Sequence, residues 1–109
     1  MKNYFFSTDI ETEELGKGIS RKILAYNGNL MSVEVNFQEG SVGELHSHPH
    51  EQMTYILEGE FLFKIKNQER IVRVGDVLYK EANAIHGCKC LKKGKLLDIF
   101  TPIRKDFLK

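Results

Sequence analysis

The sequence has little cysteine, little proline and almost no excess of charge of either sign. Its 109 residues include two cysteines and two prolines, and 16 basic residues stand against 15 acidic ones, for a formal charge of +1. Nucleic acids and anionic membrane surfaces select proteins with a dense basic patch, so this balance argues against both as partners. We therefore expect the chain to act on a small molecule.

Long apolar stretches are also absent. No run approaches the roughly 20 residues that a membrane-spanning helix needs. The first residues turn acidic at Asp9 before the core of a signal peptide could form, which predicts a cytoplasmic protein. The length suits a single domain over residues 1–109, because a chain of this size buries roughly 60–70% of its unfolded surface in one core.

The two cysteines, Cys88 and Cys90, are separated by a single residue. On a strand their side chains would share a face, but a disulfide between them would close a very tight and strained ring. The second cysteine pair that a structural zinc site would need does not exist in this sequence. We predict free thiols that serve as small buried residues.

Alternating hydrophobicity predicts strands along most of the chain. Apolar and polar residues alternate over 31–37, and Asn-Gly-Asn at 27–29 predicts a hairpin turn back to a strand at 19–26. Further turns are predicted at 59–60, 66–69, 75–76 and 92–95, strands at 84–86, 89–91 and 96–100, and a loose acidic stretch at 9–14. Roughly nine or ten short strands without a helical period favour an antiparallel barrel or jelly roll.

Three of the four histidines stand together in the run His-Ser-His-Pro-His. Strand side chains alternate between faces, so His46 and His48 would project the same way, and Gln52 keeps that parity unless Pro49 shifts the register. Imidazoles on one side can hold a transition metal, and a Gln oxygen can add a ligand. His86 could close the site from another strand. Any one of these histidines could be an ordinary surface residue, but the combined pattern favours a metal site.

These residues resemble the two motifs of the cupin superfamily. The first motif, glycine, His-x-His, an acid and a second glycine, is matched in spacing by Gly40, His46, His48, Gln52 and Gly59, with Gln in place of the acid. In the second motif Gly75 and His86 match, whereas Glu81, Asn83 and Cys90 depart from the usual Pro, Gly and Asn. The resemblance implies an all-β antiparallel double-stranded β-helix, or jelly-roll barrel, with one divalent transition metal on His46, His48, Gln52 and His86.

Gln52 is neutral where the family usually has a carboxylate. A cation held by three imidazoles and one amide oxygen keeps its full double charge, so it would be a stronger Lewis acid but more weakly bound. Redox chemistry is less favoured by such a ligand set. The ligand types leave nickel, zinc, manganese and iron open.

A second group of interest lies near the end of the chain. Asp98 and Phe100 would share one strand face, with Leu97 and Ile99 on the other, and Arg104 follows. Taken alone, these residues could be a surface ion pair and a core aromatic. If their face lines a barrel mouth, Asp98 could act as a general base and Arg104 could bind an anionic group. Leu97 and Ile99 would then need cover, which predicts a homodimer.

This run and the histidine motif together resemble the small cupins of pectin and alginate breakdown that act on 4,5-unsaturated uronates. The resemblance implies that Asp98 and Arg104 are catalytic, that Phe100 and Arg104 contact the substrate, and that a cyclic unsaturated uronate is converted to its linear keto form. Two alternatives stay open: a non-catalytic, metal-dependent module that binds sugar acids, and another metal-dependent enzyme such as a dioxygenase or isomerase.

Overall fold

Strands make up nearly all of the regular structure of residues 1–108, the part of the chain that the computed structural model describes. The elements are η1 (Ser7–Asp9), β1 (Glu13–Gly16), β2 (Ile19–Asn27), β3 (Leu30–Phe37), β4 (Val42–His46), β5 (Glu51–Ile65), β6 (Gln68–Arg73), β7 (Val77–Lys80), β8 (His86–Thr101) and η2 (Lys105–Phe107). Among these described elements, no helix is long and apolar enough to cross a membrane. The cytoplasmic location stays a prediction.

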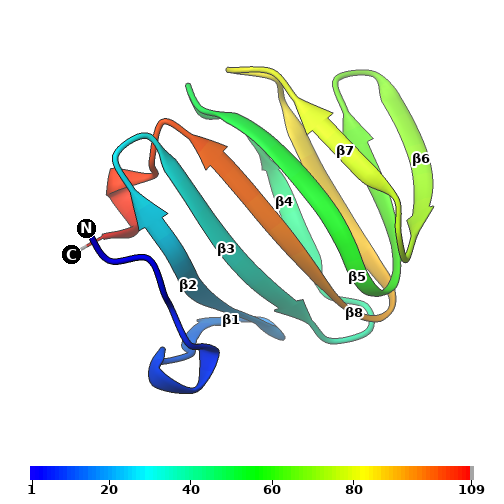
Figure 1. The fold of residues 1–109 in the computed structure, drawn as a ribbon. Helices are drawn as coiled ribbons and strands as arrows, with labels where there is room; N and C mark the ends of the chain where they lie inside the picture. Colours follow the sequence, from blue (N-terminus) through cyan, green and yellow to red (C-terminus); the bar gives the residue numbers. More distant parts are fainter. Residues whose placement is uncertain (109) are drawn as a thin grey trace.

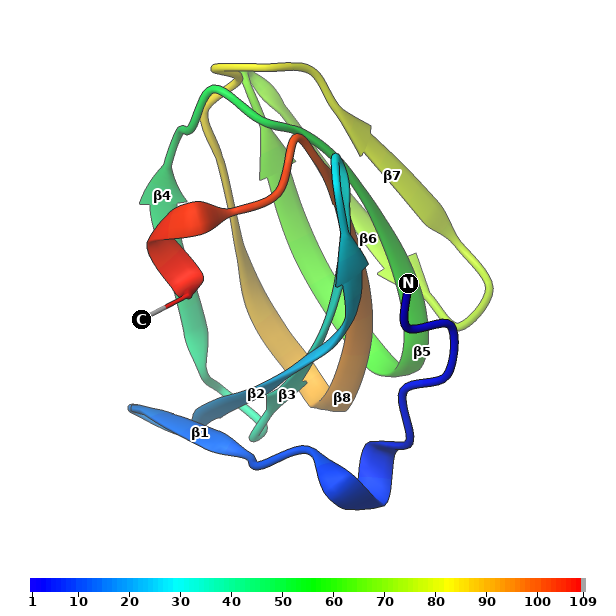
Figure 2. The ribbon, with the colours of Figure 1, turned by 60° about the vertical axis from the view of Figure 1, so that its left-hand side comes forward.

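The strands pair antiparallel in the order β1-β2-β3-β8-β5-β6, with β4 beside β8 and β7 beside β5. The sheet curls on itself into an open barrel (Figures 1 and 2), because two strands, β5 and β8, are long enough to bend from one wall into the other. The predicted fold class, an all-β antiparallel barrel, is confirmed. The C-terminal segment, red in Figure 2, lies at the open side of the barrel.

The pairing register places residues of β7, β5, β8 and β3 in rows across the interior. The row nearest the mouth contains Lys80, Gln52, Phe100 and Met31, and the next contains Leu78, Thr54, Asp98 and Val33. A third row, from β5, β8 and β3, contains Ile56, Leu96 and Val35. Polar side chains thus enter the interior at the mouth, and aliphatic ones fill it below.

The far end of the barrel is an apolar core. Phe37 and Phe61 meet edge to face with ring centroids 5.2 Å apart, and Phe63 packs beside Phe61. Cys90 is fully buried among them, whereas Cys88 is half-buried, and both thiols are free, as predicted. Desolvation raises the pKa of the Cys88 thiol to about 12, so it stays protonated near neutral pH.

Two of the turns predicted from the sequence are absent from the described chain. The glycine-containing segments at 59–60 and 92–95 do not end strands, since β5 and β8 run through them with shifts of register near Glu58 and Glu60. Gly59 has a φ of +79°, and a Cβ there would lie 2.4 Å from the carbonyl oxygen of Lys93. The missing side chain therefore allows the strands to bend in close contact instead of separating.

Two shorter predictions also need correction. The acidic stretch at 9–14 is partly ordered, because β1 begins at Glu13, whose carboxylate lies 3.4 Å from the guanidinium of Arg21. The strand expected at 84–86 begins only at His86, because Ala84 is still part of the turn that precedes it, where its N–H bonds the carbonyl of Glu81.

Candidate functional site

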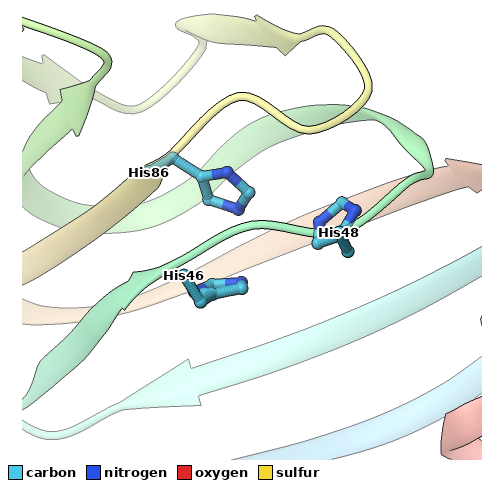
Figure 3. A group of neighbouring side chains, drawn as sticks. All are labelled: His46, His48 and His86. Atoms are coloured by element: carbon cyan, nitrogen blue, oxygen red, sulfur yellow. The ribbon is translucent and has the colours of Figure 1, made fainter.

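Three histidines from separate segments meet at the mouth of the barrel (Figure 3). His46 ends β4 and pairs across the ladder with His86, which begins β8. The prediction that His48 shares a strand with His46 is wrong, since His48 lies in the connection between β4 and β5. The connection nevertheless turns its ring inward. The ring centroids lie 4.4 Å apart for His46 and His86, 5.2 Å for His48 and His86, and 5.7 Å for His46 and His48.

Backbone carbonyls fix the proton position on two of these rings. The Nδ1–H of His46 donates to the carbonyl of Glu44 at 2.8 Å, and the Nδ1–H of His86 donates to that of Ala84 at 2.9 Å. A neutral imidazole that donates at Nδ1 has its lone pair at Nε2. The chain thus prepares both Nε2 atoms as ligands before any cation is bound, an arrangement typical of histidines in metal sites.

The third ring faces Gln52. The Nε2 of His48 lies 2.9 Å from the Oε1 of Gln52, and the Nδ1 accepts a bond of 3.3 Å from the backbone N–H of His50. Two ligands at about 2.1 Å from one cation and at right angles to each other would be about 3 Å apart. One nitrogen from each of the three histidines lies within 4.8 Å of the others, so the donor set fits a single cation with small side-chain movements.

Two of the rings at this site, those of His48 and His86, are kept neutral near pH 7 because burial lowers their pKa. Desolvation is the main cause that lowers the pKa of His86 to about 3, and the nearby Lys80 ammonium lowers it further. Desolvation also lowers the pKa of His48, where the bond to Gln52 opposes the shift. Neutral imidazole is the form that binds metals, so protons compete weakly for this site.

A cavity of about 120 Å³ opens beside these rings. Among its lining residues are six of the seven site residues predicted from the sequence: His46, Gln52, His86, Asp98, Phe100 and Arg104. The seventh, His48, contacts the edge of Phe100, with ring centroids 5.7 Å apart. A wider groove of about 380 Å³ between β6 and β7 contains none of these residues.

The two charged residues predicted near the C-terminus do not pair with each other. Asp98 accepts a short bond of 2.6 Å at Oδ1 from the hydroxyl of Thr54. The guanidinium of Arg104 instead forms a two-pronged bond to the carboxylate of Asp106, at 3.0 and 2.7 Å. That pair holds the pKa of Asp106 below its usual range.

Aromatic rings hold Arg104 at the cavity wall. Its guanidinium carbon lies 4.1 Å from the ring centroid of Phe107 and 5.2 Å from that of Phe100. Arg21 of β2 also lies over Phe107, at 4.0 Å. Cation–π contacts of this kind favour a fixed guanidinium, so η2 and its flanking residues form one side of the cavity.

Three residues of the site were missed by the sequence analysis: Thr54, Lys80 and Phe107. Parity could have found two of them, because Thr54 shares the strand face of Gln52, and Lys80 shares that of Leu78. A lysine is nevertheless expected to face solvent. Phe107 had no such signal, since it follows the last strand on η2.

The barrel and its histidine-lined mouth define the class of protein. The family model described as "Cupin domain" matches residues 33–100, more than half of the chain, and the chain belongs to the cupin family. It is 40% identical over 110 residues to the pectin degradation protein KdgF of Dickeya dadantii, covering 99% of this chain and all of that protein.

Two solved structures agree with this assignment over almost the whole chain. An RmlC-like cupin from Shewanella frigidimarina superposes with a TM-score of 0.94 at 33% identity, covering 99% of this chain and 97% of the other. KdgF from a Halomonas species superposes with a TM-score of 0.94 at 31% identity, covering 99% and 100%. The chain is therefore a cupin that resembles pectin-degradation cupins.

Proposed function

We propose that this chain, acting as one cupin domain over residues 1–109, converts a 4,5-unsaturated uronate from its cyclic form to the linear keto form. The observation that carries the proposal is that a cluster of three imidazoles adjoins one cavity lined by Asp98, Phe100 and Arg104. The 40% identity to a pectin degradation protein supports the same class of substrate.

A divalent transition metal, with nickel, zinc, manganese and iron as candidates, would be held by His46, His48, His86 and the amide oxygen of Gln52. When bound, such a cation supplies a Lewis acid that polarises sugar oxygens. Gln52 carries no charge where a carboxylate would carry one, so the chain leaves the positive charge of such a cation available to the substrate.

Asp98 is suited to move a proton. Its Oδ1 is occupied by the hydroxyl of Thr54, and Asp98 lines the cavity, so Oδ2 is the oxygen that would serve a substrate. Ring opening takes a proton from the anomeric hydroxyl, breaks the bond between C1 and the ring oxygen, and returns a proton to C4 as C5 becomes a ketone. Asp98 would accept the first proton and deliver the second, so the reaction is an isomerisation without an oxidant or reductant.

The charges of the site favour an anionic ligand. Lys80, Arg104 and a bound cation would outweigh the carboxylates of Asp98 and Asp106. The carboxylate of a uronate would bind the guanidinium of Arg104, in competition with Asp106, while the ring of Phe100 forms a wall against the sugar.

The test follows the conjugated enol absorbance of a purified 4,5-unsaturated uronate in ultraviolet light, after metal analysis of the freshly prepared protein. The protein should accelerate the loss of absorbance, and His48→Ala and Asp98→Ala should abolish the acceleration with the fold intact by circular dichroism. Unchanged decay with each candidate metal restored would overturn the proposal. If the inert protein still bound the uronate, it would be a binding module, whereas oxygen uptake with bound iron would indicate a dioxygenase.

We also propose a homodimer formed through the outer face of the sheet. Apolar side chains gather there on β5, β7 and β8. Five of them are 36–55% exposed, namely Met53, Tyr55, Leu57, Val77 and Tyr79, and Leu97 and Ile99 are partly buried. Glu51 borders this face and accepts a hydrogen bond from the hydroxyl of Tyr79. A twofold axis would bring one such face against its copy. Sedimentation velocity should give a dimer that Tyr55→Lys with Val77→Lys dissociates, and a monomer at micromolar wild-type concentration would contradict the proposal.

A further inference from the structure

Lys80 adds positive charge to the cavity but moves no proton in the proposed reaction. It ends β7, lies in the cavity wall, and is only 2% exposed. Its Nζ lies 4.8 Å from the ring centroid of Phe63 and 2.8 Å from the hydroxyl oxygen of Thr54. Burial of a lysine is costly unless its ammonium has partners, so this position calls for a specific explanation.

The hydroxyl of Thr54 has all of its hydrogen-bonding capacity used. A hydroxyl offers one proton and two lone pairs. Lys80 can only donate, and it occupies one lone pair at 2.8 Å; the Nε2 of Gln52 donates to the other at 3.3 Å. The single proton of Thr54 is therefore directed to the Oδ1 of Asp98, at 2.6 Å.

Because all hydrogen bonds of the Thr54 hydroxyl are in use, it fixes the orientation of the Gln52 amide and the role of the Asp98 oxygen. Because the NH₂ of Gln52 faces Thr54, its Oε1 must face the Nε2 of His48, where a cation would be bound. Because the proton of Thr54 points to Asp98, the Oδ1 of Asp98 is held as a hydrogen-bond acceptor. If Thr54 were free to rotate its proton toward Gln52, the amide could turn and present its NH₂ to the cation, which is not a ligand.

We propose that Lys80 is a positioning residue that acts through Thr54 to keep Gln52 as an oxygen ligand and Asp98 as a proton acceptor. The second half of this inference rests on the proposed function, whereas the first half concerns the donor set alone.

The first experiment uses cobalt(II) as the probe and needs no sugar. Wild-type protein, Lys80→Met, Thr54→Val and the double variant are titrated with Co²⁺, and both affinity and the visible spectrum are recorded. Residues behind metal ligands affect affinity by about 10–100-fold, so each single variant should weaken Co²⁺ binding within that range and change the spectrum. The double variant should be no weaker than Thr54→Val, because both changes act through one hydroxyl.

Rescue separates positioning from packing. Thr54→Ser keeps the hydroxyl and loses a methyl group, so it should retain the wild-type spectrum and affinity, while Thr54→Val keeps the shape and loses both. Wild-type Co²⁺ binding by a folded Lys80→Met protein, or losses that multiply in the double variant, would overturn the inference. If Lys80→Met does not fold, wild-type binding by Thr54→Val overturns it equally well.

Turnover then tests the second half. With a uronate that the wild-type protein converts, Lys80→Met should lower kcat at least tenfold with little change in KM, because Asp98 acts after binding. An unchanged kcat would overturn the claim that Lys80 acts on Asp98 through Thr54. If the wild-type protein converts no uronate, the proposed function fails while the cobalt result still decides the role of Lys80 toward Gln52.

Discussion

The inner and outer faces of β5 and β8 differ in polarity, and near the mouth the inner face is the more polar of the two. Near the mouth, the inner face pairs Gln52 with Phe100 and Thr54 with Asp98, whereas the outer face pairs Met53 with Ile99 and Tyr55 with Leu97. Gln52 and Thr54 are 5% and 0% exposed, but Met53 and Tyr55 are 48% and 43% exposed. Three of the four inner residues are polar and all four outer residues are mainly apolar, the reverse of the usual pattern.

The difference shows which forces shape each face. Buried polar groups are tolerated only when they have partners, and Thr54 reaches three of them. The residue types of the inner face are thus those of a hydrogen-bonded site, and those of the outer face suit the proposed contact with a second copy. Below the mouth, where Ile56 and Leu96 face inward, the ordinary pattern returns.

The largest effect is expected at the histidines. Since changes behind a ligand cost about 10–100-fold, His86→Ala should weaken binding of nickel or cobalt by more than about 100-fold and abolish turnover. Its neighbour Ile85 is 55% exposed, so Ile85→Ala should leave metal affinity and turnover unchanged. Calorimetric titration with the metal measures the difference, and equal affinities for the two variants would refute the ligand assignment.

Asp98 and Leu97 test the two faces at adjacent positions. Asp98→Asn removes a proton acceptor at almost constant volume, so turnover of the uronate should fall by about 10²–10⁴ with metal binding retained. Leu97→Asn should leave turnover of the assembled protein intact but weaken self-association, measured by sedimentation. Equal turnover in wild-type protein and Asp98→Asn would exclude Asp98 as the general base.

A smaller effect is expected where the interior is apolar. Ile56 is fully buried, so Ile56→Ala should lower the free energy of unfolding by about 2–5 kcal/mol. Val77 is 54% exposed on the outer face, and Val77→Ala should cost less than about 1 kcal/mol. Urea unfolding at one fixed protein concentration compares them, and similar losses would mean that the outer face is as well packed as the inner one.

The smallest effect concerns the rim where the faces meet. Arg104 lowers the pKa of Asp106, so the stability from this pair is present above the ordinary Asp value of 3.8 and disappears as the pH falls through the lowered pKa. The Asp106 side chain is 57% exposed, which limits the contribution to about 0.2–1 kcal/mol. Asp106→Asn should therefore lower Tm slightly at pH 7, and the difference should shrink as the pH falls below 3.8. A difference that does not shrink would show that Asp106 acts by other means.

Hydrophobic alternation and motif spacing were the two sequence signals that predicted most of the fold and of the candidate site. Strand alternation predicted an all-β antiparallel barrel, a shared face for Asp98 and Phe100 and the parity of Gln52, because a strand has a strict period of two. The approach of His86 to the other histidines was implied by the resemblance to the cupin motifs. The structure brings these residues to one cavity. Their chemical roles stay predictions.

Other features depend on contacts that only folding creates. A lysine is expected to be exposed, but Lys80 is buried, and its ammonium donates to the hydroxyl of Thr54, which in turn donates to Asp98. The partner of Arg104 is decided by the short η2 turn, which brings Asp106 back beneath the guanidinium. Glycine and lysine runs predict chain reversal, but long β5 and β8 strands bend through them.

That bend has a mechanical consequence. At Gly59 a side chain has no room against the backbone of Lys93, and at Gly94 a Cβ would lie 2.6 Å from the carbonyl oxygen of Glu58. The bend in each long strand is thus held by close backbone contacts at two glycines, one on β5 and one on β8. The apolar end of the barrel therefore fixes the direction of the strands. Side chains around the mouth can be substituted to support another reaction while the strands that carry them keep their positions.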